Sequence, residues 1–184
     1  EEVLDLLMLP EVAAHLELDG LSQPQWRSLL QAAGIRWGRD AQHRVRWGYP
    51  DDAQHSWRWG LDRLLLGLQL EDAFPENEAD AGQWQSIAAC HGPLATAEVV
   101  LALNDACGRL FEQLQQLEAP QTPDAWNRNL AQAVQQLGGS GNDDGWQSPE
   151  LYALLEPLRL AGDQKLELDS AAVVTLLEEA EAQE

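Results

Sequence analysis

The sequence predicts an all-α, multi-helix fold. Apolar residues recur along most of the chain at spacings of three and four, the period of a helix that buries one face. Serine, threonine or aspartate precedes several of these runs, and proline stands in several first turns, as is typical of helix starts. Alternation of the kind found in strands occurs at residues 165–168, too short a stretch to predict a strand.

The individual helices follow from local signals. We expect helical segments over residues 4–8, 10–16, 22–33, 40–47, 56–68, about 93–117, 122–137, 148–158 and 169–177. In the first third of the chain, Ser22 and Gln25 form a capping-box signature, and Gly34 suits the left-handed residue that follows a helix. Asp40 and Ser56 are expected to cap the next two helices.

Similar signals divide the rest of the chain. Two prolines end the long helix, after which Thr122 or Asp124 begins the next one. Residues 148–150 open another helix, and Asp169 caps the last. We expect one helical domain over 1–184, with either a single core or two lobes, 1–70 and 83–184, joined by an acidic loop at 71–82. The chain lacks an initiator Met and begins in a helical pattern, which favours a segment of a longer polypeptide.

The charge is strongly asymmetric along the chain. Eleven Lys and Arg residues against 31 Asp and Glu give a formal net charge of −20. Residues 27–63 nevertheless hold seven basic residues and four acidic ones, whereas the remainder holds four basic and 27 acidic. Because phosphate contacts need Lys and Arg, a nucleic-acid interface over the whole surface is excluded. Contact with phosphate or an acidic partner is expected from 27–63.

No catalytic, metal or cofactor site is predicted. The four histidines are too scattered for a helical metal face, and no nucleophile motif occurs. Residues 140–151 resemble a calcium loop but have Ser140 and Leu151 where acidic ligands are required. Cys90 and Cys107 are expected as reduced, buried small residues. No apolar run approaches the roughly 20 residues that span a bilayer, and no secretory pattern opens the chain. The sequence therefore predicts a cytoplasmic protein without membrane contact.

The segment from Gly34 to Gly67 holds six of the ten arginines and four of the eight tryptophans. We interpret its aromatic and leucine residues as the packing centre of the helices. The candidate structural residues are Trp37, Trp57, Trp59, Leu64 and Leu65, with Asp62 and Arg63. The alternative is a surface that binds nucleic acid. Its candidate residues are Arg36, Arg39, Arg44 and Arg46, with Trp47 or Tyr49 as a stacking platform.

Charged residues in so apolar a segment need partners. An unpaired buried charge is costly, so we expect a buried or half-buried ion pair between Arg36 or Arg63 and Asp40 or Asp62.

Two motifs in this segment resemble a known family. Gly34-Ile-Arg-Trp-Gly-Arg-Asp40 and His55-Ser-Trp-Arg-Trp-Gly-Leu-Asp-Arg-Leu-Leu-Leu-Gly67 are similar to the RecC family, the gamma subunits of exodeoxyribonuclease V. The similarity is tight across roughly 1–70 and extends as a pattern to 169–181. The chain departs from the family at Arg39 and Trp59, where a small apolar residue and Phe are typical.

This resemblance implies a fold and a function. The fold would be the helical 2B insertion of a superfamily 1 helicase-like protein that has lost its motor residues. The function would be that of a scaffold and DNA-handling subdomain in the RecBCD helicase–nuclease, which acts in double-strand break repair and recombination. The partners would be the remainder of RecC and the RecB and RecD subunits, with DNA reached through the complex. ATP hydrolysis and strand cutting would belong to partner subunits.

Two alternatives remain open. The chain is either a direct DNA-binding module that uses the arginines of 36–46, or a free-standing acidic protein–protein adaptor. Salt-dependent affinity for duplex DNA would distinguish the first from a scaffold.

Overall fold

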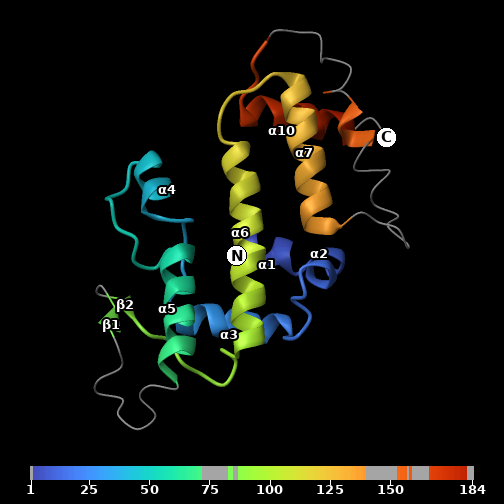
Figure 1. Cartoon of the computed structure of the whole chain (residues 1–184). Coiled ribbons are helices and arrows are strands. Elements are labelled where there is room, and N and C mark those ends of the chain that lie inside the picture. The colour runs from blue at the N-terminus through green and yellow to red at the C-terminus, as the bar shows by residue number, and fades with distance from the viewer. Residues whose placement is uncertain are drawn as a thin grey trace. The chain divides into compact units, whose positions relative to one another are not determined.

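The fold is mostly helical, as the sequence predicts (Figure 1). The computed structural model describes residues 2–71, 83–84, 87–139, 153–156, 158 and 166–181. The helices that it bounds are α1 (Glu2–Leu7), α2 (Pro10–His15), α3 (Gln23–Ala33), α4 (Ala41–Arg46), α5 (Trp57–Glu71), α6 (Ala97–Gln116), α7 (Pro123–Gly138) and α10 (Ser170–Glu181). A minimal antiparallel pair, β1 (Gln83–Trp84) with β2 (Ile87–Ala88), was not predicted, because two-residue strands leave no periodic pattern.

The predicted helix caps are confirmed within the described residues; the helix start predicted at 148–150 lies outside them. Ser22 and Gln25 form the capping box of α3, and Gly34 follows that helix with a φ of +78°. Each of the other predicted cap side chains accepts a backbone N–H from the first turn of its helix: Asp40, Ser56, Thr122 and Asp169. The expected start of the long helix near residue 93 was wrong. The backbone N–H of Ala95 bonds to the carbonyl of Gly92 in a turn, and α6 begins at Ala97.

The chain forms two compact units, residues 1–105 and 106–184. The division falls within α6, at its ninth residue. Of the acidic segment at which we expected two lobes to join, residues 72–82 lie outside the described part of the chain, so that expectation stays a prediction. The calcium-like sequence at 140–151 also lies outside it.

The core of the first unit lies around α3 and α5, which pack against each other (Figure 1). Trp26 of α3 is 1% exposed, and its indole N–H donates to the carbonyl of Leu18 at 3.0 Å. Two glycines of α5 mark close approaches to other segments. A Cβ on Gly60 would lie 2.1 Å from a side-chain carbon of Ile35, and one on Gly67 would lie 2.1 Å from the carbonyl oxygen of Cys90.

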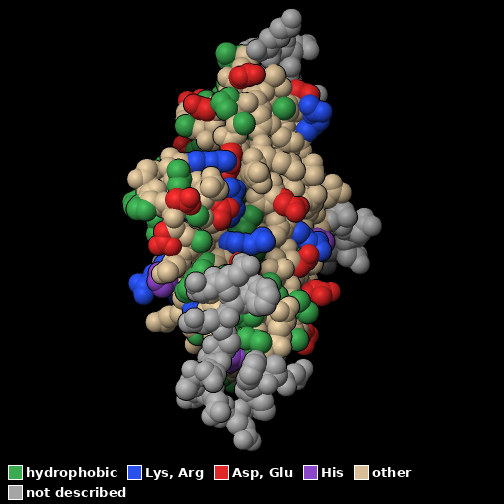
Figure 2. All heavy atoms as spheres, turned by 60° about the vertical axis from the view of Figure 1, so that its left-hand side comes forward, with side chains coloured by type: hydrophobic (Ala, Val, Ile, Leu, Met, Phe, Trp, Pro, Cys, Tyr) green, Lys and Arg blue, Asp and Glu red, His purple; other side chains and the backbone are tan. Residues whose placement is uncertain are grey.

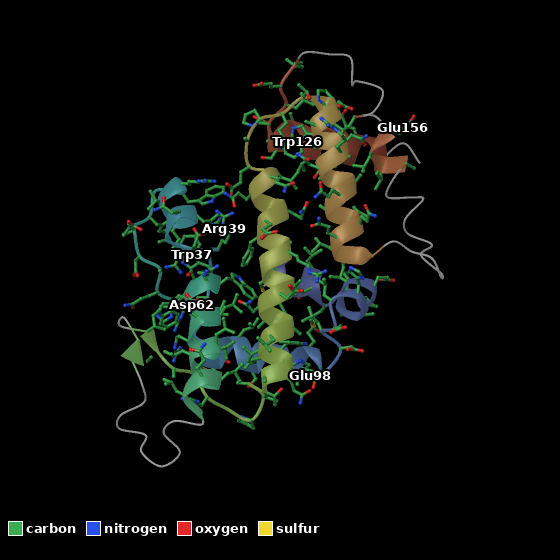
Figure 3. All side chains as sticks on the ribbon, in the orientation of Figure 1. Trp37, Arg39, Asp62, Glu98, Trp126 and Glu156 are labelled. Carbon is green, nitrogen blue, oxygen red and sulfur yellow. The ribbon has the colours of Figure 1, made fainter. Side chains whose placement is uncertain are left out.

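The second unit has its own core, in which α7 and α10 take part. Trp126, labelled on α7 in Figure 3, is 2% exposed and packs with Leu158 and Val173. Its indole N–H donates to the carbonyl of Leu168 at 2.8 Å, and Leu168 pairs with Gln121 through two backbone hydrogen bonds. The strand-like sequence at 165–168 therefore ends in a single β-bridge.

None of the described helices combines the length and the apolar character that crossing a bilayer requires.

Candidate functional site

The two halves of the motif lie side by side in the first unit. The backbone N–H of Arg36 donates to the carbonyl of His55 at 2.9 Å, and that of Trp57 donates to the carbonyl of Gly38 at 3.0 Å. These bonds hold the 34–40 loop against the start of α5, and Figure 1 shows α4 beyond that end of the helix. The fold brings the two motifs together across about 20 residues, which their spacing in the sequence does not reveal.

Arg44 of α4 points inward. The residue is 6% exposed, and its guanidinium donates to the carbonyls of Asp52 at 2.9 Å, Gln54 at 2.6 Å and Trp37 at 2.8 Å. The guanidinium carbon also lies 4.9 Å from the centre of the Trp37 ring, within cation–π range. Gly38, at φ +78°, leaves room for this side chain, since a Cβ there would lie 3.0 Å from Arg44. Arg44 therefore joins the segments before and after α4.

Arg63 of α5 has a similar role at the other end of the motif. Its guanidinium donates to the carbonyls of Ala33 at 2.7 Å and Ala88 at 2.9 Å. The central carbon of the guanidinium lies 4.8 Å from the centre of the Trp59 ring. A Cβ on Gly34 would lie 3.0 Å from both side chains. Arg63 thereby joins the end of α3 to β2, and the indole of Trp59 covers the guanidinium.

The predicted ion pair between Arg36 or Arg63 and Asp40 or Asp62 was wrong. Among the described residues, Asp40 instead pairs with the neighbouring Arg39 at 2.9 Å, and Asp62 pairs with the arginine four residues earlier on α5 at 3.7 Å. Figure 3 labels Arg39 beside α4 and Asp62 on α5. Backbone carbonyls satisfy the guanidinium of Arg63 without a carboxylate. The order of charged side chains along the sequence does not reveal which carbonyls the fold turns toward an arginine.

The start of α4 forms a small electrostatic cluster. Burial by itself would raise the pKa of Asp40, but the backbone N–H of His43 (2.7 Å) and the Arg39 guanidinium outweigh it and lower that pKa. Burial, together with the positive charge of Arg39, lowers the pKa of His43. At neutral pH the carboxylate is therefore charged and the imidazole neutral.

The four arginines that we predicted as nucleic-acid contacts differ in exposure. Arg36 and Arg46 are exposed, whereas the Arg39 side chain is 14% exposed and Arg44 is buried. On the face shown in Figure 2, which brings α4 and α5 forward, basic and acidic side chains are interspersed, and no continuous basic patch is visible. Of the four arginines that the sequence offers as phosphate contacts, two therefore lie exposed at the surface, Arg36 and Arg46.

The predicted packing residues also divide. Trp57 and Leu64 are buried, at 6% and 0% exposure. Trp59 and Leu65 are half-buried, as are Asp62 and Arg63, whereas Trp37 is 41% exposed. Two neighbours of Trp37 are more exposed still, Trp47 at 70% and Tyr49 at 55%.

A pocket of about 400 Å³ lies beside the motif in the first unit. Apolar groups that include Leu4 and Trp57 contribute to its lining, together with Arg27 and Arg36. Arg27 also lies 3.7 Å from Asp5. Sequence reasoning missed this pocket, because its lining comes from α1, α3, the loop that follows α3 and the start of α5, and no local pattern connects them.

The described residues show no group of three or more His, Cys, Asp or Glu side chains placed to hold a metal ion. Cys90 and Cys107 are free and buried, as predicted. Burial raises the pKa of Cys107 to about 12, so this thiol stays protonated at neutral pH.

Comparison with known proteins gives two matches. A family model described as the fourth domain of the RecBCD enzyme subunit RecC matches residues 1–184. The chain is also 33% identical over 132 residues to the RecBCD enzyme subunit RecC of Escherichia coli (strain K12). That match covers 72% of this chain and 10% of the relative, so the chain spans only a small part of the length of the curated protein that it matches.

Proposed function

The chain belongs to the RecC fourth-domain family, and on that premise we propose that it is a non-catalytic scaffold and DNA-handling subdomain of a RecC subunit. Its parent assembly would be the RecBCD helicase–nuclease of double-strand break repair and recombination. Its contacts would be with the remainder of RecC and with the RecB and RecD subunits, and DNA would be reached through the complex. We further propose that its helices correspond to the 2B insertion of a superfamily 1 helicase-like fold.

The scaffold proposal rests on one observation: two arginines of the motif donate hydrogen bonds to the backbone of the domain itself. Arg44 and Arg63 together donate to five backbone carbonyls, and each guanidinium lies over a tryptophan ring. These bonds use three of the five N–H donors of Arg44 and two of the five of Arg63, and they hold both guanidinium groups against the backbone of the domain. The residues that distinguish the motif therefore maintain the shape of the domain, which is what a scaffold needs.

The DNA-binding alternative rests on a specific observation too. Arg36 and Arg46 are exposed, and Trp47 and Tyr49 present aromatic surface near them in the sequence. Stacking of a base on an aromatic ring contributes about 1–3 kcal/mol, and cations along the strand add salt-dependent affinity. The net charge of −20 opposes this, since it repels phosphate at long range.

The two proposals predict different results for charge reversal in the assembled complex. Arg36→Glu with Arg46→Glu would be introduced into full-length RecC, the complex formed with RecB and RecD, and the affinity for a duplex end measured from 50 to 200 mM salt. A scaffold role predicts affinity within about twofold of wild type and an unchanged salt slope. Direct binding predicts a slope lower by about 0.9 for each phosphate that the two arginines no longer neutralise.

Arg128→Glu provides the matched control. Arg128 lies on α7 in the second unit, its side chain is 70% exposed, and it pairs with Asp124 four residues earlier. Its reversal changes net charge without touching the motif. A loss of DNA affinity seen only with the Arg36 and Arg46 reversals would contradict the scaffold proposal and favour the alternative.

The second part of the test asks whether assembly of the complex requires this domain to be intact. Arg63→Ala removes the hydrogen bonds that join α3 to β2. We expect a lower yield of assembled complex by size-exclusion chromatography, while each complex that does assemble keeps its ATP-hydrolysis rate. Full assembly with a reduced hydrolysis rate would contradict a non-catalytic role.

A further inference from the structure

We propose that the exposed face around α4 is an intramolecular docking surface, covered by an apolar, acid-rimmed surface of the longer RecC polypeptide outside these 184 residues. This α4 surface consists of Trp37, Val45, Trp47 and Tyr49. The inference rests on the proposed scaffold function and adds to it the face that is covered and the chemistry of what covers it.

The first support is the concentration of exposed aromatic groups. Within the described residues, the three aromatic side chains among the exposed large hydrophobics are Trp37, Trp47 and Tyr49, at 41%, 70% and 55% exposure. Val45, at 45% exposure, lies on α4, between Trp37 and Trp47 in the sequence. Single exposed apolar residues are ordinary, but exposed aromatic groups in the short segments that flank one helix mark a candidate interaction surface. Tryptophan and tyrosine are also the residues that dominate binding energy at protein interfaces.

The second support is that these exposed side chains are held in place. The rings of Trp37 and Tyr49 meet edge to face, with centroids 4.7 Å apart, and the Arg44 guanidinium lies over Trp37. The indole N–H of Trp47 lies 3.4 Å from the ring nitrogen Nε2 of His43. Side chains that are already ordered lose less entropy when a partner covers them. The α4 surface is thus built as an ordered contact face.

The charge around the surface indicates what covers it. Residues 36–49 contain four arginines and one aspartate in a chain whose net charge is −20. Arg44 is turned inside and Arg39 pairs with Asp40, so few surface cations remain to follow a phosphate backbone. Asp51 and Asp52, both exposed, follow directly and would repel such a backbone. A protein surface with an apolar centre and one or two carboxylates opposite the exposed Arg36 can avoid Asp51 and Asp52, whereas a nucleic-acid strand carries a phosphate at every nucleotide; the protein surface therefore fits these observations better.

The length of the E. coli relative supports a covering surface on the same polypeptide. The matched region is 10% of the E. coli relative, so most of such a polypeptide lies outside the region that this chain represents. A surface on the same polypeptide is present at high effective concentration, which favours contact without a large area. Interfaces between domains of one chain are also of moderate size, so a small cluster of exposed aromatic side chains can contribute much of one.

Site-specific photo-crosslinking tests the proposal. The photoreactive amino acid p-benzoylphenylalanine would replace Val45, which leaves the three aromatic side chains intact, in full-length RecC alone and in the RecBCD complex with a duplex end. The same substitution at Gln69, an exposed residue of α5, reports unspecific crosslinking. We expect crosslinks from position 45 to peptides of the same polypeptide outside these 184 residues, containing Asp or Glu, in both preparations. Their yield should exceed the background at position 69 at least fivefold.

A second variant keeps the test decisive. Trp47→Ala is expected to lower the crosslink yield from position 45 at least fivefold, whereas Arg128→Ala should leave it unchanged. Crosslinks to RecB, RecD, a second copy of the chain or DNA, or none above background, would overturn the inference. Crosslinks to RecB or RecD would leave the scaffold proposal standing, because that proposal fails only by the assembly and salt-dependence measurements.

Discussion

Replacing Arg44 is the sharpest test of how the motif holds the domain together. Arg44→Ala deletes three hydrogen bonds from a charged donor to the carbonyls of Trp37, Asp52 and Gln54, and it removes the cation from the Trp37 ring. The segments before and after α4 would then lose their common partner. Arg44→Lys keeps the charge, but a point-like ammonium cannot reach three carbonyls that the planar guanidinium reaches together.

The size of the effect follows from these hydrogen bonds. Hydrogen bonds that involve a charged group contribute about 1.5–3 kcal/mol each, and the losses are not additive. Water can replace part of the interaction at the exposed residues Asp52 and Gln54, and the buried Nε of Arg44 has no acceptor among the described residues, which lowers the net gain. We therefore expect Arg44→Ala to lower the free energy of unfolding by roughly 3 kcal/mol and Arg44→Lys by about 2 kcal/mol.

Urea unfolding of the 184-residue chain, followed by circular dichroism, measures both losses. Arg36→Ala is the matched control, because Arg36 is an exposed arginine eight residues away, and its loss should be within about 0.5 kcal/mol. Equal losses for Arg44→Ala and Arg36→Ala would refute the reasoning. So would a loss below about 0.5 kcal/mol for Arg44→Ala, since the guanidinium would then not join the two segments.

Three further predictions follow. Gly67→Ala should destabilise the chain by several kcal/mol in the same assay, roughly the upper end of overpacking costs, because its Cβ would meet the Cys90 carbonyl at 2.1 Å. Gly108→Ala, with nothing within 4 Å, should stabilise α6 by about 0.5–1 kcal/mol; a loss at both glycines would contradict this. Asp40→Ala should cost about 1 kcal/mol at pH 7. The pKa of Asp40 is lowered from 3.8 in the folded chain, so the stabilisation by its charge should be complete above that value and lost as pH falls below it. The free energies of unfolding of wild type and Asp40→Asn, measured between pH 2 and 6, should therefore converge at low pH. Parallel curves would contradict this. Cys107, with its pKa raised to about 12, should resist iodoacetamide at pH 8 until urea unfolds the chain, and labelling of the native chain at the unfolded rate would disprove its burial.

Much of the secondary structure was predictable because its causes are local. Capping by Ser22, Asp40 and Thr122 depends on a side chain and an N–H two or three residues away, so the sequence carries the signal. We predicted the start of α6 four residues too early. No helix-breaking residue follows Pro93, so the sequence does not show that a turn occupies the residues between Gly92 and the first residue of the helix, Ala97. The two-residue strands β1 and β2 gave no signal at all.

The candidate site was less predictable. Trp57 and Leu64 are buried, and leucine and tryptophan at helical spacing are typical of a buried face. Trp37 was expected to pack inside and is 41% exposed; Arg44 and Tyr49 cover part of its ring, and the rest faces outward. The predicted ion pair was wrong because the Arg63 guanidinium donates to backbone carbonyls of α3 and β2 instead of a carboxylate. These carbonyls are distant from Arg63 in the sequence.

The sequence by itself determined that the chain is helical, where most of its helices begin, and that it belongs with RecC, since periodicity, caps and two motifs are all readable within a few residues. Only the tertiary structure decided which arginines serve the fold. Arg44 and Arg46 stand two residues apart on a helix of six, yet one is buried and the other exposed. The difference arises because the carbonyls of Trp37, Asp52 and Gln54 converge on one side of α4, and that convergence exists only after the chain has folded.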